Sequence, residues 1–395
     1  MKTISSILEI NIARILRFIW QEKNASRIAI AKQLDLDKST VTKIVGYFIE
    51  LGLVREVGLG NPGPNGGRKP IYIEITKEVF CVGGIEINPE RVVCCLLDLH
   101  GTVLFQYQED LTPEIYEEIH LKGVFSNAYK ILSAEAEKRG IALIGVGIGI
   151  PGLVNSENGI INNSEPLMIY QQCSFSELVS DCTDIPVFIE NDARCCCHGE
   201  LMMNNSPLVK NMIFLLTEYR IRQPVSDSKK NLSIGMGIVM DGKIVRGPEG
   251  YAGEFRSMFL EQGGDSQFAS DLYSLDSVDP DNDKVFAELS RHVAFLVNVL
   301  NIQSVYIGGI EQEYASKIEK MVQERVSVQW AYGQKKDFSV RTATFGGLAV
   351  AYGAASMFIE QIFSLPNLMH PEKNGSYLLE YLDFMSMKQR KSKMS

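Results

Sequence analysis

A group of small polar and cationic side chains lies near the start of a predicted helix in the first fifty residues. Hydroxyl and ammonium groups at a helix N-terminus can reach the phosphates and base edges of a DNA major groove. The group comprises Lys38, Ser39, Thr40, Thr42 and Lys43. Two further cations, Arg68 and Lys69, follow a pair of glycines, where little side-chain bulk hinders approach to a phosphate backbone or a minor groove. The pattern predicts contact with double-stranded DNA.

Three helices are expected to position these side chains. A first helix with one inward face is predicted by apolar residues at helical spacing, which are Leu8, Ile12, Ile15, Leu16 and Ile19. Ser26 is placed to cap a second helix that ends near Leu34. After a tight turn over residues 35–37, Asp37 is placed to cap a third helix that runs to about Leu51.

The third helix divides into an apolar face and a polar face. Its apolar residues at i, i+3, i+4 and i+7 are Val41, Ile44, Val45 and Phe48. They leave the polar group and Tyr47 toward solvent. Beyond it, a loop rich in Gly and Pro at 58–70 and alternating residues at 71–75 predict a two-stranded wing. The alternatives are a unit that binds protein instead of DNA, and a solvated linker at 58–70.

Length and composition limit the number of domains and the class of protein that the chain can form. At 395 residues it is expected to hold two to four domains, counting about 100 to 200 residues for each. Hydrophobic residues make up 45% and charged residues 22%, which are ordinary globular values. With no apolar run of membrane-spanning length and no signal-peptide pattern, we expect a cytoplasmic protein.

Positive charge is concentrated at the N-terminus. Residues 1–80 hold 12 Lys and Arg against 8 Asp and Glu, whereas the whole chain has a net charge of −9. Only the N-terminal part therefore suits a polyanionic partner.

Eight cysteines are clustered, with a pair at 94–95 and a triplet at 195–197. This clustering differs from the spread-out framework of a secreted disulfide domain and from the paired spacing of a structural zinc site. We expect reduced thiols that pack in the core.

From Cys81 onward, predicted strands and helices alternate. Apolar runs at 92–97, 145–150 and 187–189 are each followed by a turn or by polar residues, and the last run leads into a helix. The first of them ends in a hairpin turn at 98–101. The alternation predicts an α/β fold.

Several of these segments together resemble the ROK family of repressors and sugar kinases. The matching segments, in chain order, are Gly147–Val154, Glu190–Ala193 with His198–Glu200, residues 233–247, Gly250–Glu254, Ile307–Gly309, Phe345–Gly347 and Gly353–Ala355. The winged unit resembles that of the family's repressor branch, so the resemblance covers about residues 8–360. The resemblance is specific because these segments follow one another in the family's order along one chain.

The resemblance implies an actin-like ATPase fold, related to ribonuclease H, with two α/β lobes behind an all-α winged helix-turn-helix domain. The expected divisions are 1–76 for the winged domain, 79–190 and 191–360 for the two lobes, and 361–395 for a C-terminal helix and tail. The residues implied to contact a sugar between the lobes are Asn163, Asn191, Asp192 and Glu254. In the kinases the aspartate that matches Asp192 is the general base. A helix-capping role for Asn191 and Asp192 is the alternative.

The chain departs from the family at the ATP phosphate loop. Kinases of the family have Asp-x-Gly-Gly-Thr-Lys there, and this chain has Glu86-Ile87-Asn88-Pro89-Glu90-Arg91. Pro89 lacks a backbone donor, and Glu90 is expected to repel phosphate oxygens. The sequence therefore predicts no catalytic residue and no nucleotide cofactor.

Two further departures lie downstream. A polar insertion at 218–232 is expected to form a solvated loop near the cleft or an assembly surface. Ser257 replaces a histidine that the family uses for zinc and sugar, and 259–268 contains no Cys or His. The sequence therefore predicts no metal, and the loss also weakens the case for a sugar ligand.

We therefore expect a transcriptional regulator, a repressor by family analogy, that binds a two-fold symmetric operator as a homodimer or homotetramer. A carbohydrate or sugar phosphate is the expected effector. The alternatives are a sugar kinase with a fused DNA-binding head and a DNA-binding scaffold without a ligand.

Overall fold

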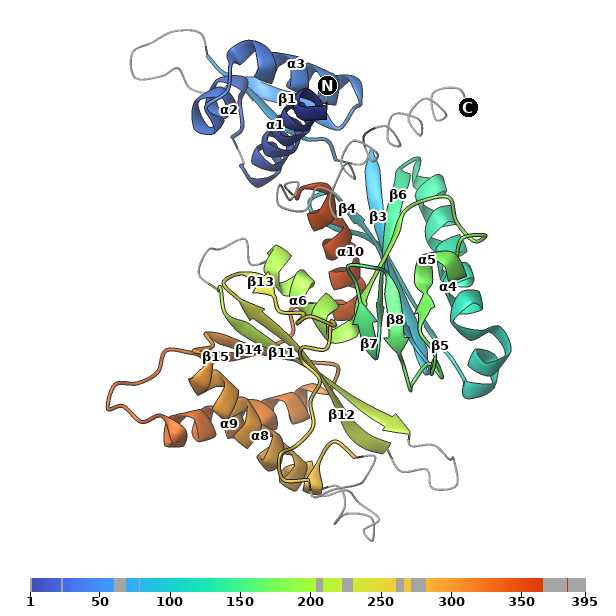
Figure 1. The fold of residues 1–395 in the computed structure, drawn as a ribbon, viewed down its shortest axis with the longest axis vertical. Helices are drawn as coiled ribbons and strands as arrows, with labels where there is room; N and C mark the ends of the chain where they lie inside the picture. Colours follow the sequence, from blue (N-terminus) through green and yellow to red (C-terminus); the bar gives the residue numbers. More distant parts are fainter. Residues whose placement is uncertain are drawn as a thin grey trace.

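A computed structural model describes residues 2–22, 24–59, 69–77, 79–203, 209–221, 230–260, 266–270, 282–364 and 382. They form an N-terminal head and a body of two lobes, and the head sits on the lobe that follows it in the chain (Figure 1). The last long helix among the described residues, over residues 349–362, runs between the two lobes and ends beneath the head (Figure 1).

The head contains α1 (Lys2–Gln21), α2 (Arg27–Leu34), α3 (Lys38–Glu50) and the antiparallel pair β1 (Val54–Leu59) and β2 (Ile71–Ile75). The predicted Ser26 cap is confirmed, since its Oγ accepts a hydrogen bond from the Ala29 amide at 3.2 Å. Asp35, which ends α2, has the left-handed conformation that allows the tight turn into α3. This arrangement is the predicted winged helix-turn-helix.

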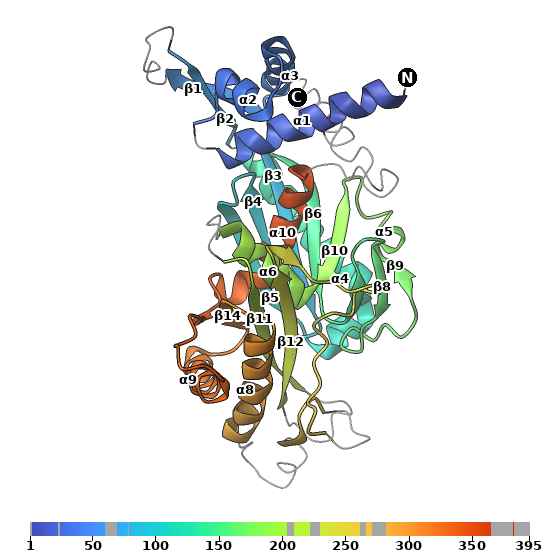
Figure 2. The ribbon, with the colours of Figure 1, turned by 60° about the vertical axis from the view of Figure 1, so that its left-hand side comes forward.

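Two local expectations in the head were wrong. Leu8 is 51% exposed, because the N-terminal part of α1 extends past the head's core (Figure 2), whereas Ile12, Ile15 and Leu16 are buried. Asp37 has the extended conformation of an N-cap residue, but its side chain makes no capping hydrogen bond.

The first lobe is built on a five-stranded sheet in the order β10-β6-β3-β4-β5. Its strands are β3 (Phe80–Asn88), β4 (Arg91–Asp98), β5 (Val103–Asp110), β6 (Ala142–Ile150) and β10 (Val187–Asn191). One face packs on α4 (Pro113–Arg139), whose apolar side chains share a buried cluster with β3, β4 and β6. A small sheet follows β6 and consists of β7 (Leu153–Asn155), β8 (Ile160–Asn163) and β9 (Cys173–Ser174), which leads into the short α5 (Phe175–Leu178).

The second lobe has a sheet in the order β13-β12-β11-β14-β15. Its strands are β11 (Met212–Ile221), β12 (Lys230–Met240), β13 (Lys243–Ile244), β14 (Ser304–Gly308) and β15 (Ser339–Thr342). Two amphipathic helices, α8 (Asn282–Val299) and α9 (Gln312–Gln329), share one buried cluster with this sheet. Each lobe is thus the α/β unit that the alternating pattern predicted.

The described ends of the insertion, 218–221 and 230–232, extend two paired strands of the second lobe and are not part of the solvated loop that we expected, whereas 222–229 lie outside the described residues. β11 and β12 pair without a break from Met212↔Val239 to Ile221↔Lys230. Polar composition predicted a loop, but strand pairing depends on partners that composition does not reveal.

Two helices lie between the lobes, α6 (Asp192–Met203) and α10 (Ala349–Ile362), with the 3₁₀ turn η1 (Gly346–Leu348) before α10. Glycines allow α10 to pack directly on the first sheet, because a Cβ on Gly147 would lie 1.9 Å from the Ala354 carbonyl oxygen. Although α10 falls in the segment 191–360, it therefore packs on the first lobe and on α6.

Each of the eight cysteines is a free thiol, as expected. The triplet at 195–197 lies on α6 and is fully buried, and burial raises the pKa of Cys195 and Cys196 well above the usual value. In the part of the chain that the structure describes, no helix is long and apolar enough to cross a membrane.

Candidate functional site

The polar face of α3 is open to solvent. Lys38, Ser39, Thr42 and Lys43 are exposed and Thr40 is half-buried, and these five residues line one shallow hollow of the surface. The opposite face, made by Val41, Ile44, Val45 and Phe48, is buried in the core as predicted. The helix is therefore anchored by one face and presents the other to a partner.

Thr42 has part of its hydrogen-bonding capacity already used. Its Oγ1 donates to the Lys38 carbonyl oxygen at 2.7 Å. The side chain then offers a partner only its methyl group and the acceptor lone pairs of its oxygen. Tyr47, which we expected on the solvent face, is half-buried against the head's core.

The wing is present, but its tip is described only in part. Lys69 is exposed just before β2, and Arg68 lies outside the described residues. The base of the wing is held by ion pairs, Arg55 with Glu74 at 2.6 Å and Arg27 with Glu56 at 2.7 Å.

Three of the four residues that the resemblance linked to a sugar lie together where β10 meets α6. Asn191 Nδ2 donates to the Gly152 carbonyl oxygen at 3.2 Å, and a Cβ on Gly152 would lie 2.5 Å from the Asn163 carbonyl oxygen. Asp192 follows directly and is 6% exposed, and its Oδ1 accepts a hydrogen bond from the Ala193 amide at 2.7 Å. Asn191 also accepts the Arg194 amide at 3.2 Å, so it does cap α6.

A fully buried arginine that the sequence did not single out organises this region. Arg194 donates to Glu190 Oε1 at 2.7 Å, to the Val154 carbonyl oxygen at 2.7 Å and to the Gly250 carbonyl oxygen at 2.6 Å. Gly250 begins the loop that carries Glu254, the fourth predicted residue, which is exposed. Arg194 thereby ties α6 to β7 and to this loop.

Glu190 is completely buried and is held between two guanidinium groups. Arg246 donates to its Oε2 at 3.0 Å, opposite the Arg194 contact on Oε1. Burial disfavours the charged carboxylate, but the attraction of Arg194 and then Arg246 outweighs it and holds the pKa of Glu190 below its usual value.

The two lobes are bonded to each other at the turn between β3 and β4. Arg91 Nη2 lies 2.7 Å from Glu86 Oε1 in its own lobe and 3.2 Å from Glu218 Oε1 of the other lobe. Asn88 Nδ2 lies 3.3 Å from both oxygens of Glu218. The turn at 86–91 and Glu218, the first residue of the insertion, therefore contact each other directly.

Glu86 is in an unfavourable setting for a charged group. Burial raises its pKa to about 7, Arg91 opposes the rise, and the nearby Glu218 and Asp192 add to it. Within the turn at 86–91, the buried carboxylate is that of Glu86, whereas Glu90, which we expect to repel phosphate, is half-buried.

Ser257, where the resemblance implied a zinc-binding histidine, is buried and lies 3.0 Å from His292 Nε2 on α8. Phe255 and Phe259 pack around the imidazole, with ring centroids 5.4 and 5.1 Å away. Among the described residues, no three His, Cys, Asp or Glu side chains are arranged to hold a metal ion.

The chain matches known proteins along most of its length. The model of the ROK family matches residues 82–265. The xylose repressor of Caldicellulosiruptor bescii is 24% identical over 407 residues, which cover 91% of this chain and 97% of that protein. The DNA-binding transcriptional repressor Mlc of Escherichia coli is 21% identical over 382 residues, covering 89% and 93%.

A solved structure has the same fold. The crystal structure of a ROK family transcriptional regulator, described as a homolog of the Escherichia coli Mlc protein, superposes with a TM-score of 0.71 at 20% identity. The match covers 96% of this chain and 100% of that one, head and body included.

Proposed function

Because the chain belongs to the ROK family, we propose that it is a DNA-binding transcriptional regulator, a repressor of carbohydrate-metabolism genes whose body senses a small ligand. The observation that carries the proposal is the polar face of α3, which is open to solvent while the opposite face is locked in the core. The test is whether the purified chain selects one family of sequences from random duplex DNA.

The recognition residues act in two ways in this proposal. Lys38, Lys43, Arg68 and Lys69 pair with phosphates, and Ser39, Thr40 and Thr42 meet base edges in the major groove. A homodimer or homotetramer would present two heads to the two halves of a symmetric operator.

The body is proposed to have no kinase activity. The turn that would hold ATP phosphates is bonded across to Glu218, and a polyphosphate there would have to displace the Arg91–Glu218 pair. It would also meet the carboxylates of Glu86 and Glu218, which repel it strongly where water is excluded. The contacts between the lobes therefore disfavour the kinase alternative, in addition to the residue types in the turn at 86–91.

Titration of the purified chain with Mg-ATP should give no measurable heat of binding up to millimolar nucleotide, because Arg91 is already paired on both sides. Isothermal calorimetry measures this directly. Phosphorylation assays with a panel of hexoses serve as the companion measurement, and micromolar ATP affinity or turnover would contradict the proposal.

The effector is proposed to lie against Asn163, Asn191, Asp192 and Glu254, whose amides and carboxylates can pair with the hydroxyl groups of a sugar. Glu86, Glu218 and Asp192 make the surroundings acidic. Neutral and amino sugars are therefore expected to bind before sugar phosphates.

Asp192→Ala should abolish the thermal shift that a sugar produces in the wild type and leave DNA binding without ligand unchanged. A thermal-shift screen of monosaccharides, amino sugars and their phosphates finds the ligand, and coupling to operator binding of about 1 to 3 kcal/mol is expected. Hits that shift Asp192→Ala equally, or a screen without hits, would favour the ligand-free scaffold.

A further inference from the structure

The head meets the body through one tryptophan at the end of α1. Trp20 stacks on Phe363, the residue that ends α10, with ring centroids 4.7 Å apart and planes 3° apart. Its Nε1 also donates to the Leu99 carbonyl oxygen in the β4–β5 turn at 2.9 Å. The indole is therefore held by two separate elements of the body.

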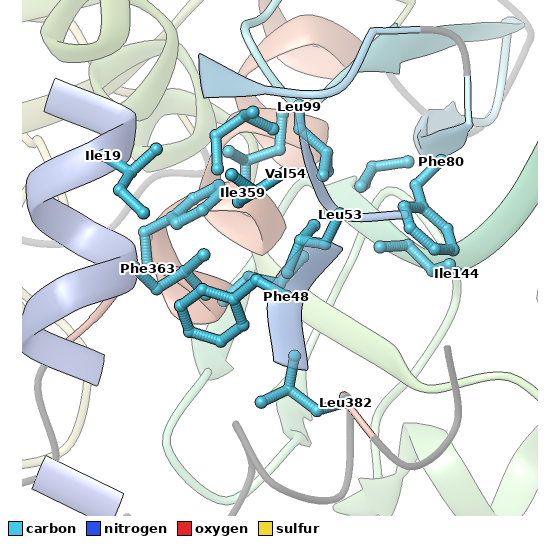
Figure 3. Close-up of a cluster of buried hydrophobic side chains, with 14 of the residues drawn as sticks. Ile19, Phe48, Leu53, Val54, Phe80, Leu99, Ile144, Ile359, Phe363 and Leu382 are labelled. Carbon is cyan, nitrogen blue, oxygen red and sulfur yellow. The ribbon is translucent and has the colours of Figure 1, made fainter. Parts of the chain in front are cut away.

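Around this contact the cores of head and body are continuous. One buried cluster combines Ile19, Phe48, Leu53 and Val54 of the head with Phe80, Leu99, Ile144, Ile359, Phe363 and Leu382 (Figure 3). The chain passes from β2 to β3 through only residues 76–79. A short connection and a shared core restrict rotation of the head.

The body side of the contact is itself fixed to the ligand region. α10 packs along α6 so closely that a Cβ on Gly353 would lie 1.7 Å from the Cys195 carbonyl oxygen. His198 Nδ1 of α6 lies 2.9 Å from Glu360 Oε2, one turn before Phe363. α10 therefore connects the helix that begins at Asp192 to the stacked pair.

We propose that Trp20 and Phe363 form a joint that fixes the orientation of the head, and that Trp20 is a positioning residue for operator recognition. Trp20 acts through the placement of α3 and does not contact DNA. In a dimer, two heads held at fixed orientations can bind two half-sites together at only one separation. The inference rests on the proposed function and adds to it the residue that sets half-site spacing.

The separation between the two half-sites is a sensitive test of head orientation, because DNA is helical. Adding one base pair moves a half-site along the axis and rotates it by about a tenth of a turn, so five added pairs place it on the opposite side of the duplex. A rigid pair of heads then loses its second contact and the gain from binding both half-sites together. Heads on a loose joint can follow the half-site.

The experiment uses the full chain and the half-site recovered by selection from random DNA. Two inverted copies of that half-site are placed at separations that vary over one helical turn, and affinity is measured at fixed salt. The wild type should show one optimum, with at least about tenfold weaker binding half a turn away. Trp20→Ala should reduce that difference at least about threefold and keep the affinity for a single half-site.

Two further variants distinguish loss of the Trp20–Phe363 contact from a general loss of structure. Trp20→Phe keeps a stacked ring and loses only the hydrogen bond to Leu99, so it should retain most of the spacing preference. Phe363→Leu changes the body side of the stack, away from α3, and should flatten the profile as Trp20→Ala does. If Trp20→Ala also lost binding to a single half-site, the dependence of affinity on half-site separation in Phe363→Leu would decide whether the joint sets the spacing.

An unchanged spacing profile in Trp20→Ala and Phe363→Leu, or a wild type without a spacing optimum, would overturn the joint while leaving DNA recognition intact. Failure of the wild type to select any sequence would instead count against the proposed function. The two failures are thus distinguishable in the same set of measurements.

Discussion

Arg194→Met should lower the free energy of unfolding by about 3 to 5 kcal/mol, the loss expected when one partner of a buried ion pair is removed. The reason is that Glu190 has no exposed surface and would keep only the Asn191 backbone amide and Arg246, whose side chain is 29% exposed. The carbonyl oxygens of Val154 and Gly250 would also lose a donor. Urea unfolding of the full chain measures the effect.

A double variant tests the cause. In Arg194→Met/Glu190→Gln no fully buried charge is left without a partner, since Arg246, which loses its carboxylate, is 29% exposed. The added second substitution should therefore cost little or recover part of the stability. Arg194→Lys keeps the charge but cannot reach three acceptors, and should fall between wild type and Arg194→Met. A loss below about 1 kcal/mol for Arg194→Met would mean that the buried pair does not hold this region together.

Thr42→Ala should reduce discrimination between the operator and random duplex by about 1 to 3 kcal/mol, the usual range for one specific base contact. Thr42 is exposed in the middle of the polar face, and its hydroxyl proton is already donated to Lys38. The methyl group or the oxygen lone pairs must therefore make the contact. Competition binding at fixed salt measures the ratio of the two affinities.

Matched substitutions identify which group of Thr42 reads the base. Thr42→Val retains the methyl group and should preserve discrimination if the contact is with a thymine methyl, whereas Thr42→Ser should preserve it if the oxygen accepts a hydrogen bond. Equal losses of affinity for operator and random DNA in Thr42→Ala would show that the residue contacts only the backbone.

Local patterns predicted the elements whose causes are local. The Ser26 cap and the inward residues of α3, such as Val45 and Phe48, follow from spacing and side-chain chemistry within one turn or two. The periodicity of α1 predicted Ile12 to Ile19 correctly but failed at Leu8, because periodicity does not tell where the core that a helix covers ends.

The site could be predicted only as a set of separate segments. Asn191 and Asp192 were found because they are adjacent in the chain and resemble a family motif. Arg194 was overlooked, since its burial depends on Glu190, Val154 and Gly250, which only folding brings together. A charged residue in the first turn of a helix is ordinarily exposed, so no local signal marked it.

The two segments that depart from the kinase pattern contact each other in the structure. The sequence showed a changed turn at 86–91 and an insertion at 218–232 as unrelated events. In the structure, Asn88 and Arg91 from the turn bond to Glu218, which begins the insertion. Protein groups thus bridge the lobes at the position where the resemblance implied phosphates.

Selection from a pool of random duplex DNA by the purified wild-type chain tests the central claim most directly. The proposed function predicts enrichment of one inverted repeat, bound about 10³-fold or more tightly than random duplex at the same salt. Affinity for both should fall as salt rises, because Lys and Arg contacts with phosphates displace counterions. Recovery of no common sequence, with equal affinity for selected and random DNA, would contradict the claim that this protein is a sequence-specific regulator.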